Sequence, residues 1–408
     1  MNQILLINVS GRDQPGLAAG LIGVLADYGV AVLDIGQASI HSELSLGFMV
    51  ELPADVDSGA VRKDFLFKAH ELKVQVSFTE ISAERYEKWV DGQGKPRHLI
   101  TLLSRRLESA QLAEVTGVIA GHGLNIDKIT HLSGRPSLGV TDGGSQACVE
   151  FSVRGKLNRS SLQADFLPLA NRLNIDVAVQ RDDIFRRNRR LVAFDMDSTL
   201  IEVEVIDELA KAAGVGDRVA EITERTMRGE LDFTASFTER LALLKGLDES
   251  VLAQIAERLP ITEGAEKLIS NLRELGFKTV ILSGGFNYFG RYLQSKLGID
   301  HVFANELEIE NGKVTGRVTG KVVDGARKAE LLEQIAAEEG IRLEQTIAVG
   351  DGANDLPMLG KAGLGIAFRA KPMVRQSADQ ALTTLGLDGI LYLIGFRDRE
   401  TFDTGLSD

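Results

Sequence analysis

Two aspartates stand one residue apart at the end of a short apolar run. Asp195 and Asp197 follow residues 191–194, and two hydroxyl residues come next. The apolar run predicts a buried strand, and in an open α/β sheet ligands bind beyond the carboxyl ends of the strands. A carboxylate placed there can attack phosphorus as a nucleophile. Taken alone, however, such a pair is more often an Asp-rich turn that caps a helix.

Three later features favour the chemical interpretation. A second apolar run ends in Ser283 and Gly284, a third ends before Asp351, and Lys328 lies between them. In this order, an acidic strand end, a hydroxyl, a lysine and a second acidic strand end resemble the haloacid dehalogenase superfamily. The resemblance implies an α/β fold over residues 183–408, with a Rossmann-like, doubly wound parallel sheet.

The resemblance also implies a role for each residue. Asp195 would be the nucleophile that forms an aspartyl-phosphate, and Asp197 would act first as general acid and then as general base. An aspartate at 197 favours a phosphatase or phosphomutase, because pumps of this superfamily carry a threonine there. Ser283 and the Gly284 amide would hold phosphoryl oxygens, while Lys328 would balance the negative charge.

Several carboxylates and a dianionic phosphate cannot share a closed cleft without a cation. We expect Mg²⁺, held by the carboxylates of Asp195 and Asp351 and by the backbone carbonyl of Asp197. Asn354 and Asp355 would support that shell.

Residues 202–261 form an insert with helical periodicity, which predicts a small helical cap over the site. Glu204, Met227 and Arg240 in this insert match the phosphoserine phosphatases, where an acid meets the substrate ammonium and an arginine its carboxylate. The resemblance therefore implies that O-phospho-L-serine is hydrolysed to L-serine and phosphate, the last step of serine biosynthesis.

Two alternatives remain open. A phosphotransferase of the same fold would pass the phosphoryl group from Asp195 to a second alcohol instead of water. An amino-acid-responsive regulatory protein would keep only a vestigial hydrolase half, although the intact set of polar residues argues against such decay.

The first 180 residues contain a degenerate repeat with the strand and helix order βαββαβ, which is typical of ferredoxin-like domains. We expect one domain over residues 1–85, a second over 95–182, and a turn-rich boundary at 91–96. The predicted strands and helices of the first copy are 4–9, 15–28, 30–40, 46–51, 61–72 and 73–80. Those of the second copy are 98–103, 112–122, 124–131, 147–153, 161–173 and 175–179.

The first copy carries the loop Gly-Arg-Asp-Gln-Pro-Gly between its first strand and a helix that we expect to open at Pro15. In a βαββαβ unit this loop resembles the ACT domains, which bind amino acids. The resemblance implies ligand contacts from Asp13, the Gly16 amide and Asp34, with serine as the expected regulatory ligand and a homodimer as the expected assembly. A loop that only connects two elements is the alternative.

The matching loop of the second copy, residues 104–109, has neither glycine nor proline. This departure leaves open whether the second copy binds a ligand or serves only as a scaffold.

Composition excludes several other classes. The net charge of −12 over 408 residues argues against a nucleic-acid partner. We expect the arginine cluster 186–190 to be a solvated linker, Cys148 to be a core thiol and the C-terminal residues 398–408 to fray. The N-terminus shows no signal-peptide pattern and no apolar run is long enough to span a bilayer, so we expect a cytoplasmic protein without membrane contact.

Overall fold

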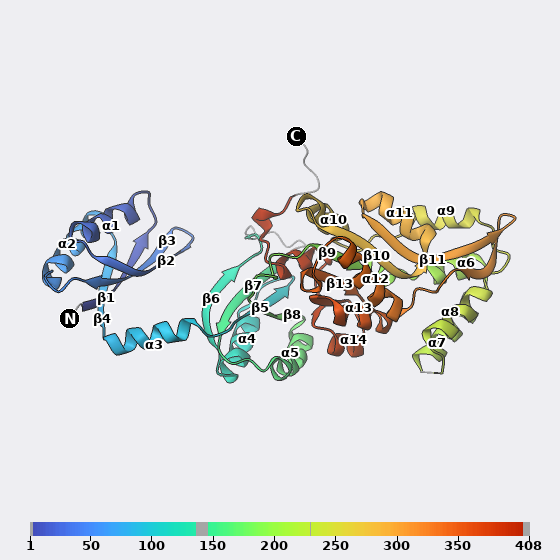
Figure 1. The fold of residues 1–408 in the computed structure, drawn as a ribbon, viewed down its shortest axis with the longest axis horizontal. Coiled ribbons are helices and arrows are strands. Elements are labelled where there is room, and N and C mark those ends of the chain that lie inside the picture. Colours follow the sequence, from blue (N-terminus) through green and yellow to red (C-terminus); the bar gives the residue numbers. More distant parts are fainter. Residues whose placement is uncertain (1–2, 136–145, 229, 403–408) are drawn as a thin grey trace. The chain divides into compact units, whose positions relative to one another are not determined.

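The computed structural model describes residues 3–135, 146–228 and 230–402, and the chain forms two compact units, 1–95 and 96–408 (Figure 1). The first unit holds a four-stranded antiparallel sheet with the order β2-β3-β1-β4. Its elements are β1 (Gln3–Arg12), α1 (Leu17–Asp27), β2 (Ala31–Ile40), β3 (Glu43–Leu52), α2 (Ser58–Glu71), β4 (Gln75–Ile81) and α3 (Ala83–Gln93). The βαββαβ prediction is confirmed for this unit.

Two details of the first unit differ from the prediction. Helix α1 begins at Leu17 and not at Pro15, because Gly16 has the left-handed φ of 86° that a helix interior excludes. Helix α3 was not predicted, although Ser82 gives a signal for it: its side chain caps the helix by accepting a hydrogen bond from the Arg85 amide.

The second unit opens with a sheet of the same design and the equivalent order, β6-β7-β5-β8. Its elements are β5 (Arg97–Ser104), α4 (Ser109–Gly121), β6 (Asn125–His131), β7 (Ala147–Arg154), α5 (Arg159–Leu173) and β8 (Asp176–Arg181). The second βαββαβ copy is therefore confirmed as well.

A seven-stranded sheet with the order β12-β11-β10-β9-β13-β14-β15 forms the rest of the second unit. Its strands are β9 (Leu191–Phe194), β10 (Lys278–Phe286), β11 (His301–Glu310), β12 (Lys313–Thr319), β13 (Thr346–Gly350), β14 (Leu364–Phe368) and β15 (Gln380–Leu382). All neighbours pair in parallel except β11 and β12. This antiparallel hairpin was not predicted, although Asn311-Gly312 at its tip is a common hairpin turn.

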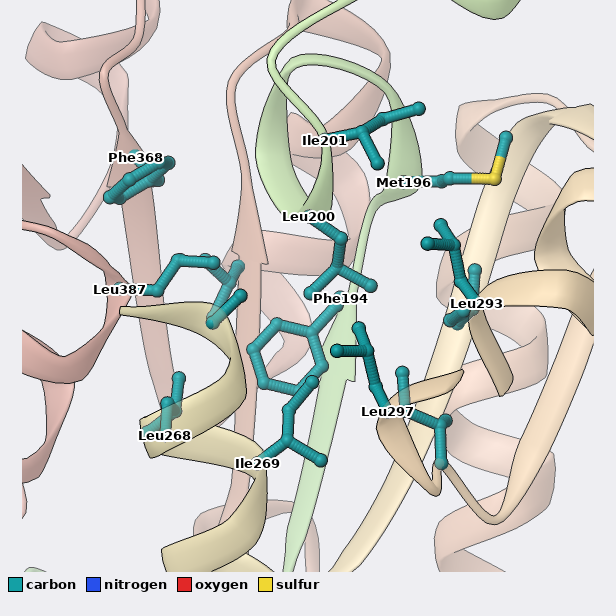
Figure 2. Packing of buried hydrophobic residues seen from close by; sticks show 14 of the residues in the cluster. Phe194, Met196, Leu200, Ile201, Leu268, Ile269, Leu293, Leu297, Phe368 and Leu387 are labelled. Atoms are coloured by element: carbon teal, nitrogen blue, oxygen red, sulfur yellow. The ribbon is translucent and has the colours of Figure 1, made fainter. Parts of the chain in front are cut away.

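Helices cover both faces of the large sheet, as expected for a doubly wound fold. Val192 and Phe194 of β9 lie in one hydrophobic cluster with α10 and α11, and Figure 2 shows Phe194 with Ile269 and Leu297. The alternate residues of β9 lie in a second cluster with α12 and α13. The helices are α10 (Ala265–Glu274), α11 (Asn287–Leu297), α12 (Gly325–Glu338), α13 (Leu356–Lys361), α14 (Pro372–Ser377) and α15 (Ile390–Leu393).

The predicted cap is helical and joins the large sheet through two short linkers. Its helices are α6 (Val205–Ala212), α7 (Gly216–Met227), α8 (Phe233–Ala242) and α9 (Ser250–Glu257). The linkers pair with each other: the Glu202 amide donates to the Pro260 carbonyl and the Thr262 amide to the Leu200 carbonyl, each at 3.0 Å. The cap is therefore connected to the large sheet by two paired linkers, which we call the hinge.

The second ferredoxin-like domain is joined to the large sheet through both polar and apolar contacts. The Gln380 side chain binds the backbone of Val179 on β8 at 2.9 and 2.8 Å. Cys148 is fully buried, which confirms the predicted core thiol, and it belongs to the same cluster as Phe194. Burial raises the pKa of this thiol.

The solvated linker predicted for residues 186–190 is wrong for two of its arginines. Arg186 and Arg189 are buried, with exposed fractions of 3% and 8%. Arg186 pairs with Glu150 of β7, and Arg189 donates to the Glu344 carbonyl. Two arginines of this cluster thus fasten the second domain and the large sheet instead of facing solvent.

The predicted fraying of the C-terminal residues is also wrong as far as Phe402, because hydrogen bonds hold this segment. Asp398 accepts from the Tyr392 hydroxyl at 2.6 Å and its amide donates to the Leu132 carbonyl at 3.2 Å. The Phe402 amide donates to Asn271 at 2.7 Å. Residues 403–408 lie outside the described part of the chain. Throughout the described helices, none has the length and apolar content to cross a bilayer.

Candidate active site

The predicted catalytic residues gather at the carboxyl ends of β9, β10 and β13. Strand β9 lies between the other two, so Asp195, Gly284 and Asp351 come to one edge of the sheet. The Asp195 amide donates to the Val349 carbonyl at 2.8 Å, which extends the pairing of β9 with β13. All three of these residues line one cavity of roughly 700 Å³ between the sheet edge and the cap.

Asp195 is buried and forms an ion pair with Lys328. The Lys328 ammonium lies 2.8 Å from Asp195 Oδ1 and 2.7 Å from Asp355 Oδ1, and it is completely buried. Burial lowers the pKa of Lys328, but the two carboxylates outweigh burial and raise it overall. The pKa of Asp195 is raised by burial and by Asp355, while Lys328 opposes both effects. The lysine therefore supplies one positive charge behind the predicted nucleophile.

The carboxylates exceed the available positive charge. One oxygen each of Asp195, Asp351 and Asp355 lies within 4.8 Å of the other two, and Lys328 is the single cation bonded to this group among the described residues. Burial and Asp355 raise the pKa of Asp351 to about 7. A hard divalent cation with oxygen ligands fits this cluster, since it would supply the missing charge. The donor set thus suits Mg²⁺.

Asp197 lies in a different environment from Asp195. Its Oδ1 accepts a hydrogen bond from the Val205 amide at 3.0 Å, at the start of the cap. Burial and the nearby Glu204 raise its pKa well above the ordinary value. Gly285 leaves room for this side chain, because a Cβ on Gly285 would approach Asp197 Oδ2 to 2.6 Å. A raised pKa suits a group that must hold a proton before donating it.

The cap contributes two of its three predicted residues to the cavity wall. Glu204 lines the cavity and accepts a hydrogen bond from the Ser198 hydroxyl at 2.9 Å. Arg240 of α8 also lines it, and its Nε is buried without a hydrogen-bond partner among the described residues. Met227 is the last residue of α7, but its side chain is not described.

The remaining predicted residues occupy two layers. Gly284 and Asn354 line the cavity. Ser283 and Lys328 lie behind it: the Ser283 hydroxyl is buried and accepts from the Gly285 amide at 2.9 Å. In this arrangement Ser283 supports the backbone of the glycine turn.

Among the acidic residues of the cavity, Asp207 escaped the motif analysis. Asp207 lines the cavity three residues after Glu204, so both lie on the same face of the first cap turn. Burial raises the pKa of Asp207, against the opposing effect of Arg240. The helical spacing from Glu204 was the available signal.

The regulatory residues predicted in the first unit are exposed. Asp13 accepts a hydrogen bond from the Ser39 hydroxyl at 3.2 Å near the end of β2, whereas Asp34 lies five residues earlier on that strand. Gly16 precedes α1, whose first amides receive no side-chain cap. Asp13 and Gly16 thus belong to the loop between β1 and α1, whereas Asp34 belongs to β2.

Two family models match the chain. Residues 192–360 match the haloacid dehalogenase-like hydrolases, and residues 3–79 match the ACT domain. The first match extends from β9 into α13 and includes the cap and every cavity residue named above.

Curated relatives resemble the chain over almost its whole length. The phosphoserine phosphatase of Streptomyces coelicolor is 42% identical over 396 residues, which are 97% of this chain and 93% of the relative. Phosphoserine phosphatase SerB2 of Mycobacterium tuberculosis is 41% identical over 394 residues, with coverages of 96% and 93%.

Solved structures agree with these matches. The probable phosphoserine phosphatase of Vibrio cholerae has a TM-score of 0.58 at 35% identity, covering 72% of this chain and 86% of that one. A HAD family hydrolase from Salmonella enterica serovar Typhi has a TM-score of 0.62 at 30% identity, with coverages of 73% and 99%.

Proposed function

This chain belongs to the phosphoserine phosphatases, within the haloacid dehalogenase-like hydrolases, and we propose that it hydrolyses O-phospho-L-serine in two steps at Asp195. The products are L-serine and phosphate, so the enzyme would catalyse the last step of serine biosynthesis. The observation that carries the proposal is the single cavity in which Asp195 and Asp197 meet Glu204 and Arg240 of the cap.

In the first step, an Asp195 carboxylate oxygen attacks phosphorus and the bond from phosphorus to the serine oxygen breaks. Asp197 donates its proton to the departing alkoxide, which leaves as L-serine. The raised pKa of Asp197 supports this role, because the proton must be present when the substrate arrives. Lys328 balances the charge behind Asp195 throughout.

In the second step, water attacks phosphorus of the aspartyl-phosphate. Asp197, now a carboxylate, takes a proton from this water, and the bond from phosphorus to Asp195 breaks. Phosphate leaves, and both aspartates return to their starting protonation states.

We assign Mg²⁺ to the carboxylates of Asp195 and Asp351 and to the backbone carbonyl of Asp197, with Asp355 and Asn354 supporting them. When bound, the ion would neutralise negative charge on the phosphoryl group and on the carboxylates. The cluster within 4.8 Å supports this assignment for Asp195, Asp351 and Asp355.

Substrate recognition is assigned to the cap. The buried Nε of Arg240 lacks a partner among the described residues, so a substrate carboxylate would satisfy it, and Glu204 would bind the ammonium. An amino acid joined to the phosphate carries both groups that these residues would bind. We assign Met227 and the Gly284 amide to the rest of the substrate contacts, with Ser283 in support.

The test is Mg²⁺-dependent phosphate release from O-phospho-L-serine and from a panel of other phosphomonoesters. We expect strong preference for phosphoserine and no activity in Asp195→Asn. Arg240→Ala should raise the KM for phosphoserine by roughly 10- to 100-fold, the loss of a hydrogen-bonded ion pair. Arg218→Ala is the matched control, since Arg218 is an exposed cap arginine outside the cavity wall.

Preference for another ester would overturn the substrate while keeping the chemistry of Asp195. Transfer of phosphate to an added alcohol in place of water would favour the phosphotransferase, and inactivity on every ester would favour a regulatory protein.

We further propose that the ACT domain binds L-serine through Asp13, the Gly16 amide and Asp34, and that the protein is a homodimer. Strand β2 supports the second statement, because it is an edge strand on which Ile35 and Ile40 are exposed by 52% and 83%. Light scattering of the purified full chain would give the mass, and a monomer would contradict the assembly.

A further inference from the structure

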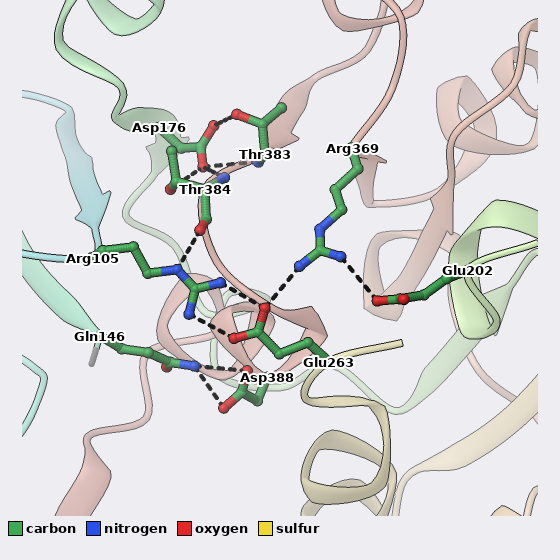
Figure 3. A network of polar contacts seen from close by, with 9 residues as sticks. All are labelled: Arg105, Gln146, Asp176, Glu202, Glu263, Arg369, Thr383, Thr384 and Asp388. Carbon is green, nitrogen blue, oxygen red and sulfur yellow. Dashed lines mark hydrogen bonds and ion pairs between the residues drawn. The ribbon is translucent and has the colours of Figure 1, made fainter. Parts of the chain in front are cut away.

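Four charged side chains of alternating sign connect the second ferredoxin-like domain, called the second ACT-like domain below, to the paired linkers of the cap (Figure 3). Arg105 binds Glu263 with two parallel hydrogen bonds of 2.6 Å. Arg369 donates to the same Glu263 at 2.8 Å and lies 3.5 Å from Glu202. The row therefore runs from Arg105 through Glu263 and Arg369 to Glu202.

Both acids of this row flank the cap linkers. Glu202 belongs to the first linker and donates its amide to Pro260 in the second, while Glu263 follows Thr262 directly. The chain enters and leaves the cap only through these linkers, so a change in the angle of the cap at this end must move them. The cap also bonds to β12, where the Gly246 amide donates to the Val314 carbonyl at 2.8 Å. The row thus holds the two linkers from the side of the large sheet.

Arg369 also lies directly before a segment that contributes to the cavity wall. It follows β14 with a left-handed φ of 43°, which is uncommon for a residue with a side chain and is typical of functionally constrained positions. Lys371, Met373 and Val374, a few residues later, line the cavity. One arginine therefore contacts both Glu202 and Glu263 and precedes a segment that lines the cavity.

Arg105 is fixed from the other side. Its Nε donates to the Thr384 carbonyl at 2.7 Å, and the Thr384 hydroxyl donates to Asp176 of β8 at 2.6 Å. Arg105 lies between β5 and α4, the same connection that holds Asp13 and Gly16 in the first ACT domain. In the second domain this loop contacts the catalytic half of the chain instead of presenting an open anion site.

The row of charges is better suited to orienting the cap linkers than to stabilising the fold. The Arg105 and Glu263 side chains are 30% and 40% exposed, and partly exposed ion pairs contribute little to stability. The two parallel hydrogen bonds nevertheless fix the orientation of the Arg105 guanidinium relative to the Glu263 carboxylate. Loss of Arg105 should therefore leave the chain folded while the linkers gain freedom.

We propose that Arg105 is a positioning residue that, through Glu263 and Arg369, holds the cap linkers so that Glu204 and Arg240 close on the substrate. The second ACT-like domain then controls the position of the cap. The substrate in this statement rests on the proposed function, whereas the control of the linkers does not.

The first test is hydrogen–deuterium exchange of the full chain, followed at peptides containing the amides of Glu202 and Thr262. Arg105→Ala should speed their exchange by about threefold, the effect of losing one ion pair. Arg159→Ala is the matched control: Arg159 pairs with Asp379 at 3.1 Å across the same interface, with similar exposure, but does not reach the linkers. Unchanged exchange in Arg105→Ala, or equal acceleration in both variants, would overturn the proposal.

The second test compares kinetics with two substrates. Arg105→Ala should raise the KM for phosphoserine by about two- to fivefold with a smaller change in kcat. The KM for p-nitrophenyl phosphate should change less, because that ester lacks the groups that the cap recognises. Arg105→Lys should recover part of the effect. Wild-type constants in Arg105→Ala would contradict the proposal, whereas inactivity of the wild type on phosphoserine would refute only the substrate and leave the exchange test decisive.

Discussion

Asp195 and Asp197 are two residues apart, yet their polar contacts differ. Asp195 contacts the Lys328 ammonium, which opposes the rise in its pKa that burial and Asp355 cause, and ionised carboxylate is the form that attacks. Asp197 has Glu204 as a charged neighbour, which favours its protonated form. Among the described residues, Lys328 pairs with Asp195 and not with Asp197, so the lysine supports the nucleophile and leaves the acid unpaired with a cation.

Asp351 links metal binding to pH. Its pKa of about 7 in the metal-free protein lies above the ordinary 3.8, so the metal-free fold loses stability as pH rises between those values. A bound cation requires the ionised form. Saturating Mg²⁺ should therefore raise the Tm by about 5 °C at pH 8 and by clearly less at pH 6.

Thermal unfolding with Mg²⁺ and with EDTA at both pH values measures this difference. Asp351→Asn is the control and should lose the Mg²⁺ response at both. Equal responses of the wild-type protein at pH 6 and pH 8 would contradict the role of Asp351.

At the scale of elements, the end of β10 and the turn after β9 approach each other too closely for a side chain between them. Gly285 occupies that point, where an added Cβ would lie 2.6 Å from Asp197 Oδ2 and 2.7 Å from Met196 Cε. The two strand ends can therefore present their polar groups to one cavity only with glycine at this position.

Gly285→Ala should displace Asp197 and lower kcat by about 100-fold, since a shift near 1 Å in a reacting group has effects of that size. Gly360→Ala is the matched control, because a Cβ there meets no atom within 4 Å. Steady-state kinetics together with circular dichroism measure activity and folding. A kcat within twofold of wild type for Gly285→Ala would refute this account of the turn.

The strands that carry the proposed catalytic residues were predictable because each is an apolar run that ends in polar residues. Strand β9 ends directly before Asp195 and β13 directly before Asp351, while β10 contains Ser283 and Gly284 near its end. The start of α1 was misplaced because the left-handed conformation of Gly16 is not visible in residue types. The burial of Arg186 depends on Glu150, 36 residues away, and no local pattern reports such a pairing.

Separation along the chain also limited the prediction of the site. Asp195, Asp197 and Asp351 were found from spacing along the chain, and Asp207 could have been found from its helical spacing to Glu204. Arg105 and Arg369 could not, because their partner Glu263 lies 158 and 106 residues away.

At the scale of the whole molecule, the exposed loop of the first unit remains the predicted sensor of the product. L-serine should bind the full chain, and Asp13→Ala should weaken that binding by about tenfold through loss of a charged hydrogen-bond partner. Calorimetry should use the Arg240→Ala background, so that serine binding in the catalytic cavity does not contribute.

Asp55→Ala serves as the control, because Asp55 is exposed in the same unit outside the loop. If serine bound neither protein, or bound Asp13→Ala and Asp55→Ala equally, the regulatory site would have to lie elsewhere.

The hydrophobic cluster around Phe194 also contains Leu103, Leu132 and Ala178 of the second ACT-like domain, whereas the cluster of the first unit contains no residue beyond 95 among those described. This division of the hydrophobic interior determines where the gene can recombine without damage to the fold. A genetic crossover near codon 95 exchanges a complete module, while one near codon 183 cuts a shared interior in two. Descendants of this gene should therefore gain or lose the first ACT domain alone and keep the second with the enzyme.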